Sequence, residues 1–301
     1  MTDQPAKFTV RNDAFFDCME PGATLEVVAN GFGFTEGPIW HPREKWLLFS
    51  DIMESRQYKW SKADGLTPFR MPSNQANGNF FDAEGQIVSC EHASSSLVLH
   101  DHDGKRVKPI ATHFEGKELN SPNDVVRDNA GRIWFTDPTF GRIREPLGIL
   151  REPMLDFQGL FRLDPDGSLH AVLRDFQQPN GLCFSADGRR LFVNDSWGEH
   201  IRVFDLKDDG SVTGGEVWAD ITGDGEGVPD GMKCTQDDKI LCNGPGGVHI
   251  LSQTGETLGV ILMPEKSTNF CFGDDGLSTL YVTASTSVYR IPIKMVGLAM
   301  I

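Results

Sequence analysis

Six polar residues stand at matching places along this chain of 301 residues, each at the opening of a similar stretch of sequence. The six openings are Glu36, Asn77, Asn123, Asn180, Asp230 and Asn269. Their carboxylate and amide oxygens suit a hard divalent cation, with Ca²⁺ the first choice and Mg²⁺ or Mn²⁺ behind it. No histidine or cysteine stands at these positions, which weakens the case for a dedicated Zn²⁺ site, although Zn²⁺ also binds carboxylates. The set predicts one divalent-cation site if the fold brings these side chains together.

The segments that must position these residues are predicted to be β-strands. Asp-Gly and related turn dipeptides recur between stretches rich in Val, Ile, Leu, Phe and Trp. Asp-Gly supplies the positive φ values that a tight hairpin turn needs. No long stretch shows the hydrophobic periodicity of a helix. The pattern therefore predicts an all-β protein.

The six openings recur at intervals of roughly 40 to 55 residues, the length of one four-stranded propeller blade. We predict a six-bladed β-propeller that forms one domain over residues 1–301, although the length alone would suggest two domains. The innermost strands of a propeller line its central channel, so the openings would converge there on a central metal site. Buried carboxylates must be paired or coordinate a cation. A β-sandwich, the alternative, gives no reason for six similar repeats.

Two further segments belong to this prediction. A strand near residues 24–29 is expected to pair into the last blade and close the ring. Residues 142–159 fall in the longest interval between openings and are predicted to be an inserted loop, with a lid over one face as its candidate role.

Each opening taken alone has a simpler interpretation. Asn-Gly and Asp-Gly are common turn dipeptides, so a single copy is more often a turn than a ligand. The recurrence once per predicted blade favours a metal site for the set. His92, at the end of a predicted inner strand, either faces the pocket or is a structural histidine, and the residues leave both roles open.

Composition and missing motifs exclude several classes of protein. The chain carries 28 Lys and Arg against 43 Asp and Glu, a formal charge of −15, which argues against nucleic-acid binding. No apolar stretch is long enough to span a membrane, and residues 1–5 show no leader pattern, so we expect a cytoplasmic protein. The six cysteines form no C-x-x-C pair and are expected to be reduced core residues. Serine-hydrolase, nucleotide and dinucleotide motifs are absent.

Five blocks of this sequence resemble the signature blocks of the gluconolactonase / regucalcin (SMP-30) family, in the family's order and over nearly the whole chain. They are F-T-E-G-P (34–38), S-P-N-D-V-V (121–126), I-W-F-T-D-P (133–138), P-N-G (179–181) and P-D-G-M (229–232). The triplet C-E-H at residues 90–92 resembles the bacterial gluconolactonase branch in particular. The resemblance implies a six-bladed propeller with one divalent metal in its channel, acting mainly as a lactonase on sugar lactones.

The resemblance also implies roles for individual residues. Carried over by motif, Glu36, Asn180 and Asp230 would be metal ligands. Asn123 would be a further ligand, or would hold water or substrate beside the metal. Ser121 stands where regucalcin has an arginine that contacts substrate, so regucalcin's substrate preference does not carry over to this chain.

The predicted function is a divalent-metal-dependent lactonase that hydrolyses a gluconolactone-like sugar lactone to its hydroxy acid. The metal would polarise the carbonyl, and Asp230 would either accept a proton from the attacking water or serve only as a ligand. Asn77, His92 and Ser121 are expected to join Asn123 on the substrate side. The alternatives are a phosphotriesterase-like hydrolase on the same metal site and a non-catalytic calcium-binding propeller scaffold. We expect a small-molecule lactone as the partner, and neither nucleic acid nor membrane; the particular lactone, the metal used and the oligomeric state are open.

Overall fold

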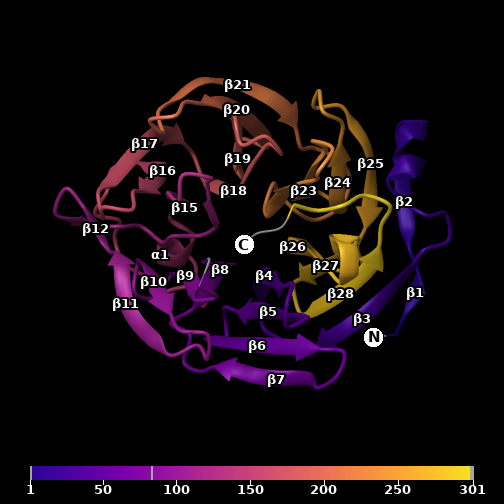
Figure 1. Ribbon diagram of the computed structural model, residues 1–301, viewed down its shortest axis with the longest axis horizontal. Coiled ribbons are helices and arrows are strands. Elements are labelled where there is room, and N and C mark those ends of the chain that lie inside the picture. The colour runs from indigo at the N-terminus through magenta and orange to yellow at the C-terminus, as the bar shows by residue number, and fades with distance from the viewer. Residues whose placement is uncertain (1, 83, 299–301) are drawn as a thin grey trace.

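The computed structural model describes residues 2–82 and 84–298. Six antiparallel sheets of four or five strands are arranged in a ring around a central axis (Figure 1). The predicted six-bladed, all-β propeller is therefore confirmed. Only short helical segments interrupt the strands in the described part of the chain.

The first four blades each take four strands in chain order. Blade 1 comprises β4 (Thr35–His41), β5 (Trp46–Asp51), β6 (Arg56–Ser61) and β7 (Gly65–Arg70). Blade 2 comprises β8 (Ala76–Phe81), β9 (Ile87–Glu91), β10 (Ser96–His100) and β11 (Arg106–Ala111). Blade 3 comprises β14 (Val125–Arg127), β15 (Ile133–Asp137), β16 (Gln158–Leu163) and β17 (Leu169–Phe176). Blade 4 comprises β18 (Pro179–Phe184), β19 (Arg190–Asp195), β20 (His200–Leu206) and β21 (Val212–Asp220).

The last two blades each include strands from the beginning of the chain. Blade 5 comprises β22 (Met232–Cys234), β23 (Ile240–Gly244), β24 (Gly247–Leu251) and β25 (Thr257–Leu262), with β2 (Lys7–Val10) at its outer edge. Blade 6 comprises β26 (Ser267–Gly273), β27 (Thr279–Ala284), β28 (Ser287–Pro292), β3 (Thr24–Asn30) and β1 (Gln4–Pro5). Strand β3 pairs antiparallel with β28, with Ala29 opposite Val288. The pairing of β2 with β25 has no counterpart in the sequence prediction.

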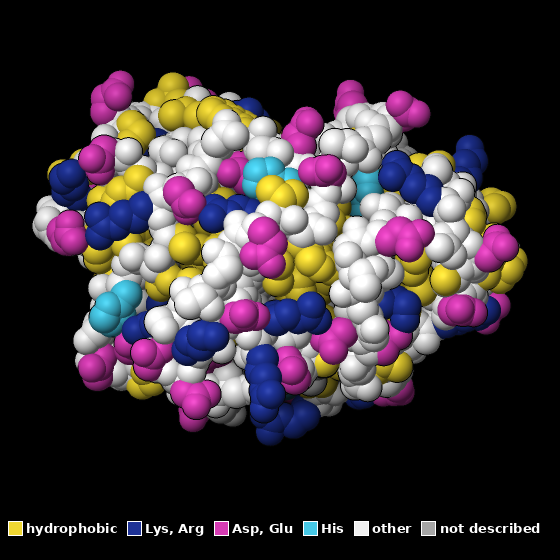
Figure 2. Space-filling model, turned by 90° about the horizontal axis from the view of Figure 1, so that it is seen from above, with side chains coloured by type: hydrophobic (Ala, Val, Ile, Leu, Met, Phe, Trp, Pro, Cys, Tyr) yellow, Lys and Arg dark blue, Asp and Glu magenta, His cyan; other side chains and the backbone are white. Residues whose placement is uncertain are grey.

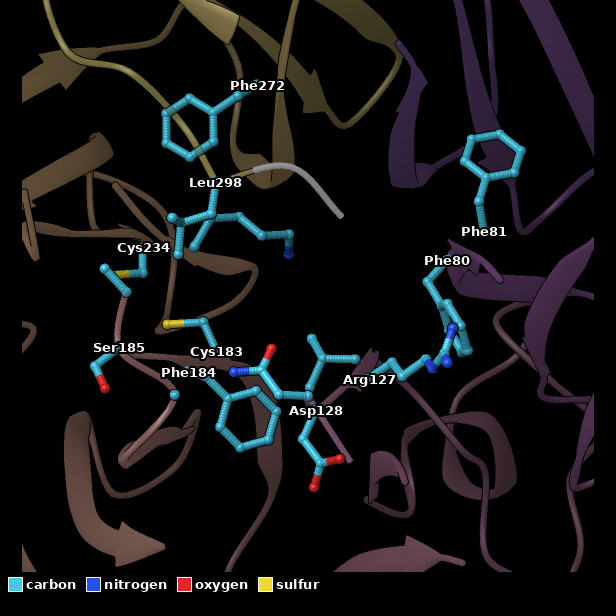
Figure 3. A pocket seen from close by; sticks show the side chains of 15 residues that line it. Phe80, Phe81, Arg127, Asp128, Cys183, Phe184, Ser185, Cys234, Phe272 and Leu298 are labelled. Atoms are coloured by element: carbon cyan, nitrogen blue, oxygen red, sulfur yellow. The ribbon is translucent and has the colours of Figure 1, made fainter. Parts of the chain in front are cut away.

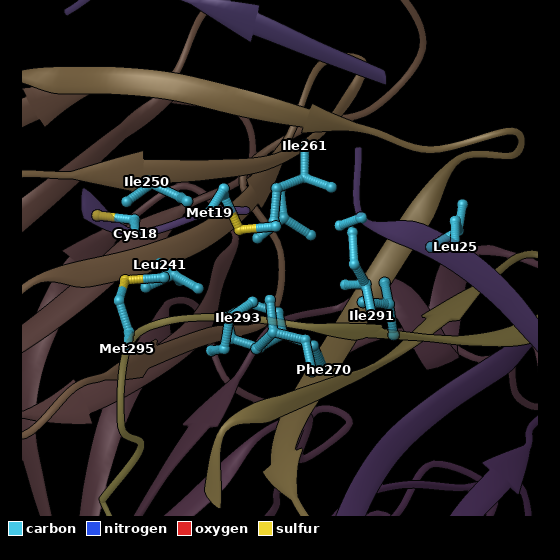
Figure 4. Close-up of a cluster of buried hydrophobic side chains, with 14 of the residues drawn as sticks. Cys18, Met19, Leu25, Leu241, Ile250, Ile261, Phe270, Ile291, Ile293 and Met295 are labelled. Atoms are coloured by element: carbon cyan, nitrogen blue, oxygen red, sulfur yellow. The ribbon is translucent and has the colours of Figure 1, made fainter. Parts of the chain in front are cut away.

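The segment between β2 and β3 packs between blades 5 and 6. Its 3₁₀ helix (Asp13–Asp17) buries Phe15, and Met19 follows in the same cluster. Figure 4 shows Met19 among apolar side chains of both blades, including Leu241 and Phe270. Because β2 and β3 belong to different blades, this buried segment links blades 5 and 6.

A small hairpin and a short helix stand outside the blades. The hairpin consists of β12 (His113–Phe114) and β13 (Lys117–Glu118), and a second 3₁₀ turn covers Asp275–Leu277. The helix α1 (Phe140–Ile143) lies near the start of the insert, which we define as residues 138–157 between β15 and β16. The sequence placed this insert at 142–159, but residues 158 and 159 belong to β16. None of these helices is long and apolar enough to cross a membrane.

The surface mixes charges of both signs. Figure 2 shows Lys and Arg side chains interspersed with Asp and Glu over the side of the propeller in view, with no continuous basic stripe on that face. All six cysteines are buried and free, as the sequence predicted.

Candidate functional site

The six openings all lie at the beginning of the innermost strand of a blade, and we call them the ring residues. Glu36, Asn77, Asn180 and Asn269 stand within β4, β8, β18 and β26, whereas Asn123 and Asp230 come two residues before β14 and β22. All six are buried. The predicted convergence of polar side chains at one end of the inner strands is thus present in the fold.

Local breaks in strand pairing accompany the ring residues. The pairing of β4 with β5 shifts register between Glu36 and Ile39, and that of β18 with β19 shifts between Pro179 and Leu182. A bulge of this kind leaves a residue outside the ladder and re-aims its side chain. The repeated break explains how a strand that pairs along its blade can still present a polar side chain to the channel.

Glu36 and Asp230 form an acidic pair in this buried region. Burial raises the pKa of the Glu36 carboxyl to about 7. Burial, and then the charge of Glu36, raise the pKa of the Asp230 carboxyl well above its usual value. Two buried carboxyl groups that disfavour each other's ionisation are stabilised as carboxylates by a nearby cation.

Two side-chain oxygens in the same region lack a hydrogen-bond partner in the described part of the chain. The amide nitrogen of Asn180 donates to Ser196 Oγ over 3.1 Å, which leaves its Oδ1 buried without a hydrogen bond among the described residues. Asp230 Oδ1 is likewise buried without a hydrogen bond among the described residues. Such unsatisfied acceptors are uncommon because they cost stability. Together with the Glu36 carboxylate they form an oxygen-only donor set that fits a hard divalent cation.

The donor set is not a conventional acidic cluster. The described residues contain no group of three or more His, Cys, Asp or Glu side chains arranged to hold a metal ion. A cation at Glu36 and Asp230 therefore needs amide oxygens as well, and Asn180 offers one. Asn123 lies beside blade 2, because its carbonyl oxygen accepts from Gly78 N over 2.8 Å.

Side chains from the neighbouring blade hold the backbone of the ring residues. Thr136 Oγ1 on β15 donates to the carbonyl oxygen of Asn180 over 2.8 Å. Asn194 Nδ2 on β19 donates to the carbonyl oxygen of Asp230 over 2.5 Å. Blades 3 and 4 thus each hold the main chain of the ring residue in the following blade.

Sequence analysis missed two cations near this site. The ammonium of Lys233, buried on β22, lies 3.4 Å from Asp124 Oδ2 and 3.3 Å from Asn269 Oδ1. Asn269 Oδ1 is therefore occupied, unlike the free oxygen of Asn180. The charge of Lys266, just before β26, opposes the rise in the pKa of Asp230. A lysine between apolar residues on an inner strand was a usable signal for Lys233, whereas nothing in the sequence distinguishes Lys266.

Asn77 and His92 lie together on the blade 2 side of the channel. His92 Nε2 is 3.2 Å from Asn77 Nδ2, and His92 Nδ1 is 2.8 Å from the carbonyl oxygen of Leu147 in the insert. Burial lowers the pKa of the His92 imidazole to about 4, so the ring is neutral at pH 7. Asn77 Oδ1 is buried without a hydrogen-bond partner among the described residues.

Ser121 contacts the insert. Its hydroxyl donates to the carbonyl oxygen of Pro138 over 2.6 Å and accepts from Gly141 N over 3.0 Å. The side chain is fully buried. In this structure the Ser121 hydroxyl holds the start of the insert against blade 3.

A buried arginine anchors the same insert. Arg142 in α1 donates to the carbonyl oxygen of Asn120 over 2.7 Å, to that of Glu152 over 3.1 Å and to Glu118 Oε2 over 2.6 Å. The guanidinium thus joins residues 142 and 152 of the insert to the segment that leads to Asn123. Through these contacts the insert packs against the blades beside Asn77 and His92.

A cavity of about 460 Å³ opens at the opposite end of the inner strands (Figure 3). Its walls include Phe80, Arg127, Cys183 and Phe272, which stand at or near the ends of β8, β14, β18 and β26. The ring residues stand at the beginnings of these strands. Lys233, whose ammonium lies 3.3 Å from Asn269 Oδ1, also lines the cavity and stands between it and the ring residues.

The fold and the polar channel define a six-bladed propeller with a buried oxygen-donor site at one end of its axis. Residues 34–286 match the family model described as the SMP-30/Gluconolactonase/LRE-like region. The chain belongs to this family, as its sequence blocks predicted.

Similar proteins include two gluconolactonases and regucalcin. The gluconolactonase of Zymomonas mobilis is 30% identical over 97% of this chain and 86% of its own length. The solved structure of XC5397, a gluconolactonase from Xanthomonas campestris, is 29% identical with a TM-score of 0.89, covering 97% of this chain and 98% of that one. Regucalcin from Xenopus laevis is 28% identical over 86% of this chain and 85% of its length.

Proposed function

We propose that this protein is a divalent-metal-dependent lactonase that opens a sugar lactone of the gluconolactone type to its hydroxy acid. The observation that carries the proposal is the buried pair Glu36 and Asp230 with the unsatisfied oxygens of Asn180 and Asp230 beside it. The gluconolactonase relatives, which align over nearly the whole chain, favour lactone hydrolysis over a phosphotriesterase or a non-catalytic scaffold.

The metal would be held by Glu36, Asn180 and Asp230, with Asn123 as a further ligand or as the group that holds water or substrate. When bound, the cation would polarise the lactone carbonyl and stabilise the negative charge that develops on its oxygen. Ca²⁺ is the first choice because all of the donors are carboxylate or amide oxygens. Zn²⁺, Mn²⁺ and Mg²⁺ are the alternatives to be compared with it.

Asp230 would act as the base. The water oxygen forms a bond to the carbonyl carbon while one of its protons passes to the Asp230 carboxylate. The bond between that carbon and the ring oxygen then breaks, and the ring oxygen takes up the proton from Asp230. Burial and the charge of Glu36 raise the pKa of the Asp230 carboxyl, whereas the charge of Lys266 opposes this rise. A cation held at the site would also favour the ionised form of Asp230, which the first transfer requires.

The substrate would lie between the ring residues and the insert. Asn77 and Asn123 are proposed to face it. Since the hydroxyl of Ser121 bonds to Pro138 and Gly141, we assign Ser121 to support of the insert in place of a direct substrate contact. His92 is proposed to act through Asn77.

The test combines metal analysis with hydrolysis. Metal content is measured on the protein as purified, the metal is removed with a chelator, and each of Ca²⁺, Zn²⁺, Mn²⁺ and Mg²⁺ is added back. A pH-indicator assay then compares aldonolactones, an aromatic lactone and a phosphotriester. We expect metal-dependent hydrolysis of an aldonolactone, reduced at least about a hundredfold in Asp230→Asn. Absence of lactone hydrolysis with every metal would overturn the proposal, and hydrolysis of the phosphotriester alone would replace it.

A further inference from the structure

We propose that Asn77 Oδ1 accepts a hydrogen bond from a substrate hydroxyl, and that the main-chain carbonyl of Leu147 sets this orientation of the Asn77 amide through His92. The proposal rests on the lactonase function and names a feature of its substrate. It makes Asn77 a binding residue for hydroxylated lactones and His92 a positioning residue that does not touch them.

The first link is the hydrogen bond between the insert and His92. A carbonyl oxygen only accepts hydrogen bonds, so the 2.8 Å contact from Leu147 requires the proton of the ring to be on His92 Nδ1. The imidazole is buried and neutral at pH 7, because burial lowers its pKa to about 4. A neutral ring carries one proton, which leaves Nε2 as an acceptor.

The second link fixes the amide of Asn77. An acceptor at His92 Nε2 requires a donor opposite it, and Asn77 Nδ2 lies there at 3.2 Å. The reversed amide would place an oxygen against a nitrogen lone pair. The donors and acceptors along the hydrogen bonds from Leu147 through His92 to Asn77 therefore allow one orientation of the Asn77 amide. In this orientation Asn77 Nδ2 donates to His92, and Asn77 Oδ1 is not used by the histidine.

That oxygen has no hydrogen-bond donor within residues 2–82 and 84–298. Asn77 is 2% exposed, and its Oδ1 has no hydrogen-bond partner among the described residues. Asn79, two residues further along β8, is equally buried but its Oδ1 accepts from Gln57 Nε2 over 2.8 Å and from Ser89 Oγ over 2.6 Å. The strand can thus satisfy a buried asparagine, and Asn77 differs from Asn79 in having its acceptor open.

Asn77 belongs to the inner strand beside the proposed metal ligand Glu36. A Cβ placed on Gly37 would lie 1.9 Å from the main-chain oxygen of Asn77, so β8 closely approaches the residue that follows Glu36. A lactone carbonyl cannot donate to Asn77 Oδ1, whereas a ring hydroxyl can. A lactone without that hydroxyl would bury the oxygen unpaired, and sites of this kind reject such analogues strongly.

The insert is held firmly enough to set the chain of hydrogen bonds. Gln75 Nε2, on the segment leading to β8, donates to the carbonyl oxygen of Pro146 over 2.6 Å, next to Leu147. Arg142 joins the insert to the main chain at Asn120. A Cβ on Gly141 would lie 2.7 Å from His92 Cβ, so α1 also restricts the position of the ring.

The first experiment reads the tautomer of His92 directly. In protein labelled with ¹⁵N-histidine, the signals of His92 are those lost in His92→Gln, and His102→Gln serves as the exposed control. We expect the Nδ1–H tautomer, unchanged from pH 6 to pH 8, and a changed Nε2 signal in Asn77→Ala. A ring protonated on Nε2 or on both nitrogens would overturn the proposal, because Asn77 could not then donate to it.

The second experiment compares two lactones of the same ring size, one with ring hydroxyls and one without. Wild type should favour the hydroxylated lactone in kcat/KM by at least about tenfold. Asn77→Ala and His92→Phe should remove most of this preference by raising KM for the hydroxylated lactone. His92→Gln, whose amide offers one donor and one acceptor, should retain part of it.

Each outcome of the second experiment has a distinct meaning. An unchanged preference in Asn77→Ala would overturn the assignment of Asn77, and so would a large loss of Ca²⁺ affinity, since the oxygen would then be a metal ligand. A wild-type protein that hydrolyses neither lactone with any metal would contradict the proposed function. In that case the tautomer of His92 would still test the hydrogen bonds that link Leu147, His92 and Asn77.

Discussion

The ammonium of Lys233 lies 3.4 Å from Asp124 Oδ2 inside the channel, and both side chains are buried. Lys233 lies on β22 of blade 5 and Asp124 directly precedes β14 of blade 3, so the ion pair joins two blades that are not neighbours in the ring. Asp124 directly follows Asn123 in the chain, and Lys233 also binds the amide oxygen of Asn269. The pair therefore places two opposite charges next to the ring residues Asn123 and Asn269.

Removing the cation of this pair should destabilise the protein. Lys233→Met leaves the Asp124 carboxylate buried without its partner, and we expect a loss of about 3–5 kcal/mol in the free energy of unfolding, measured by urea denaturation. The double variant Lys233→Met/Asp124→Asn should recover part of this loss. Lys108→Met, on an exposed strand, is the control and should stay within about 0.5 kcal/mol of wild type. A single variant as stable as wild type would contradict a buried ion pair.

Acid should unfold the protein partly through Glu91. Burial alone would raise the pKa of its carboxyl, but hydrogen bonds from His100 and Ser94 and the charge of Arg70 outweigh burial and hold the pKa at about 2. A carboxyl whose folded pKa lies below its unfolded value stabilises the fold above pH 4.5, and this contribution is lost as the pH falls toward 2. Its size is about 3 kcal/mol.

The measurement is the free energy of unfolding as a function of pH. Glu91→Gln should be less stable than wild type at pH 7, and the difference should shrink between pH 4.5 and pH 2, where wild type loses its advantage. Glu115→Gln, whose side chain is largely exposed, should follow the wild-type curve. Parallel curves for Glu91→Gln and wild type would show that Glu91 does not carry this dependence.

The sequence predicted the blades because each one repeats its own local signals. A hairpin turn and a polar opening recur in every blade, and these signals depend on neighbours in the chain. The pairing of β2 with β25 has no such signal, because Lys7 pairs with Leu262 at the outer edge of blade 5, where the sequence has no repeated motif. The pairing of β2 with β25 was therefore a part of the fold that local patterns left out.

Some residues of the candidate site could likewise be predicted from the repeat, whereas their contacts with distant residues could not. Glu36 and Asp230 were found because their positions repeat, and carboxylates at repeated positions are conspicuous. The bond between His92 and Leu147 depends on a main-chain carbonyl, which every residue type offers, so residue types carry no trace of it. Ser121 was assigned by its place in a motif, and only the structure shows that its hydroxyl is bonded to Pro138 and Gly141.

The close packing of Gly141 gives a further prediction. An added Cβ would lie 2.7 Å from His92 Cβ and 2.9 Å from Ser121 Cβ, so Gly141→Ala must displace the insert or the histidine. We expect a loss of about 1–3 kcal/mol in stability, measured by thermal unfolding, together with a weaker preference for hydroxylated lactones. Gly223→Ala is the control, since its new Cβ would have no neighbour closer than 3.7 Å. Full stability and full preference in Gly141→Ala would contradict the tight contact between α1 and His92.

The acidic pair leads to opposite predictions for the metal-free and metal-bound protein. Asp230→Asn removes one of two buried carboxyl groups that disfavour each other's ionisation, so the metal-free variant should be as stable as wild type or more stable, by about 1 kcal/mol. Ca²⁺ at a hundred times its Kd should stabilise wild type by about 2.7 kcal/mol, and the variant far less. Calorimetric unfolding with and without Ca²⁺ measures both effects, with the exposed Asp224→Asn as the control. Equal stabilisation of wild type and Asp230→Asn by Ca²⁺ would mean that Asp230 is not a ligand, whereas a metal-free variant much less stable than wild type would mean that the carboxyl has a structural partner.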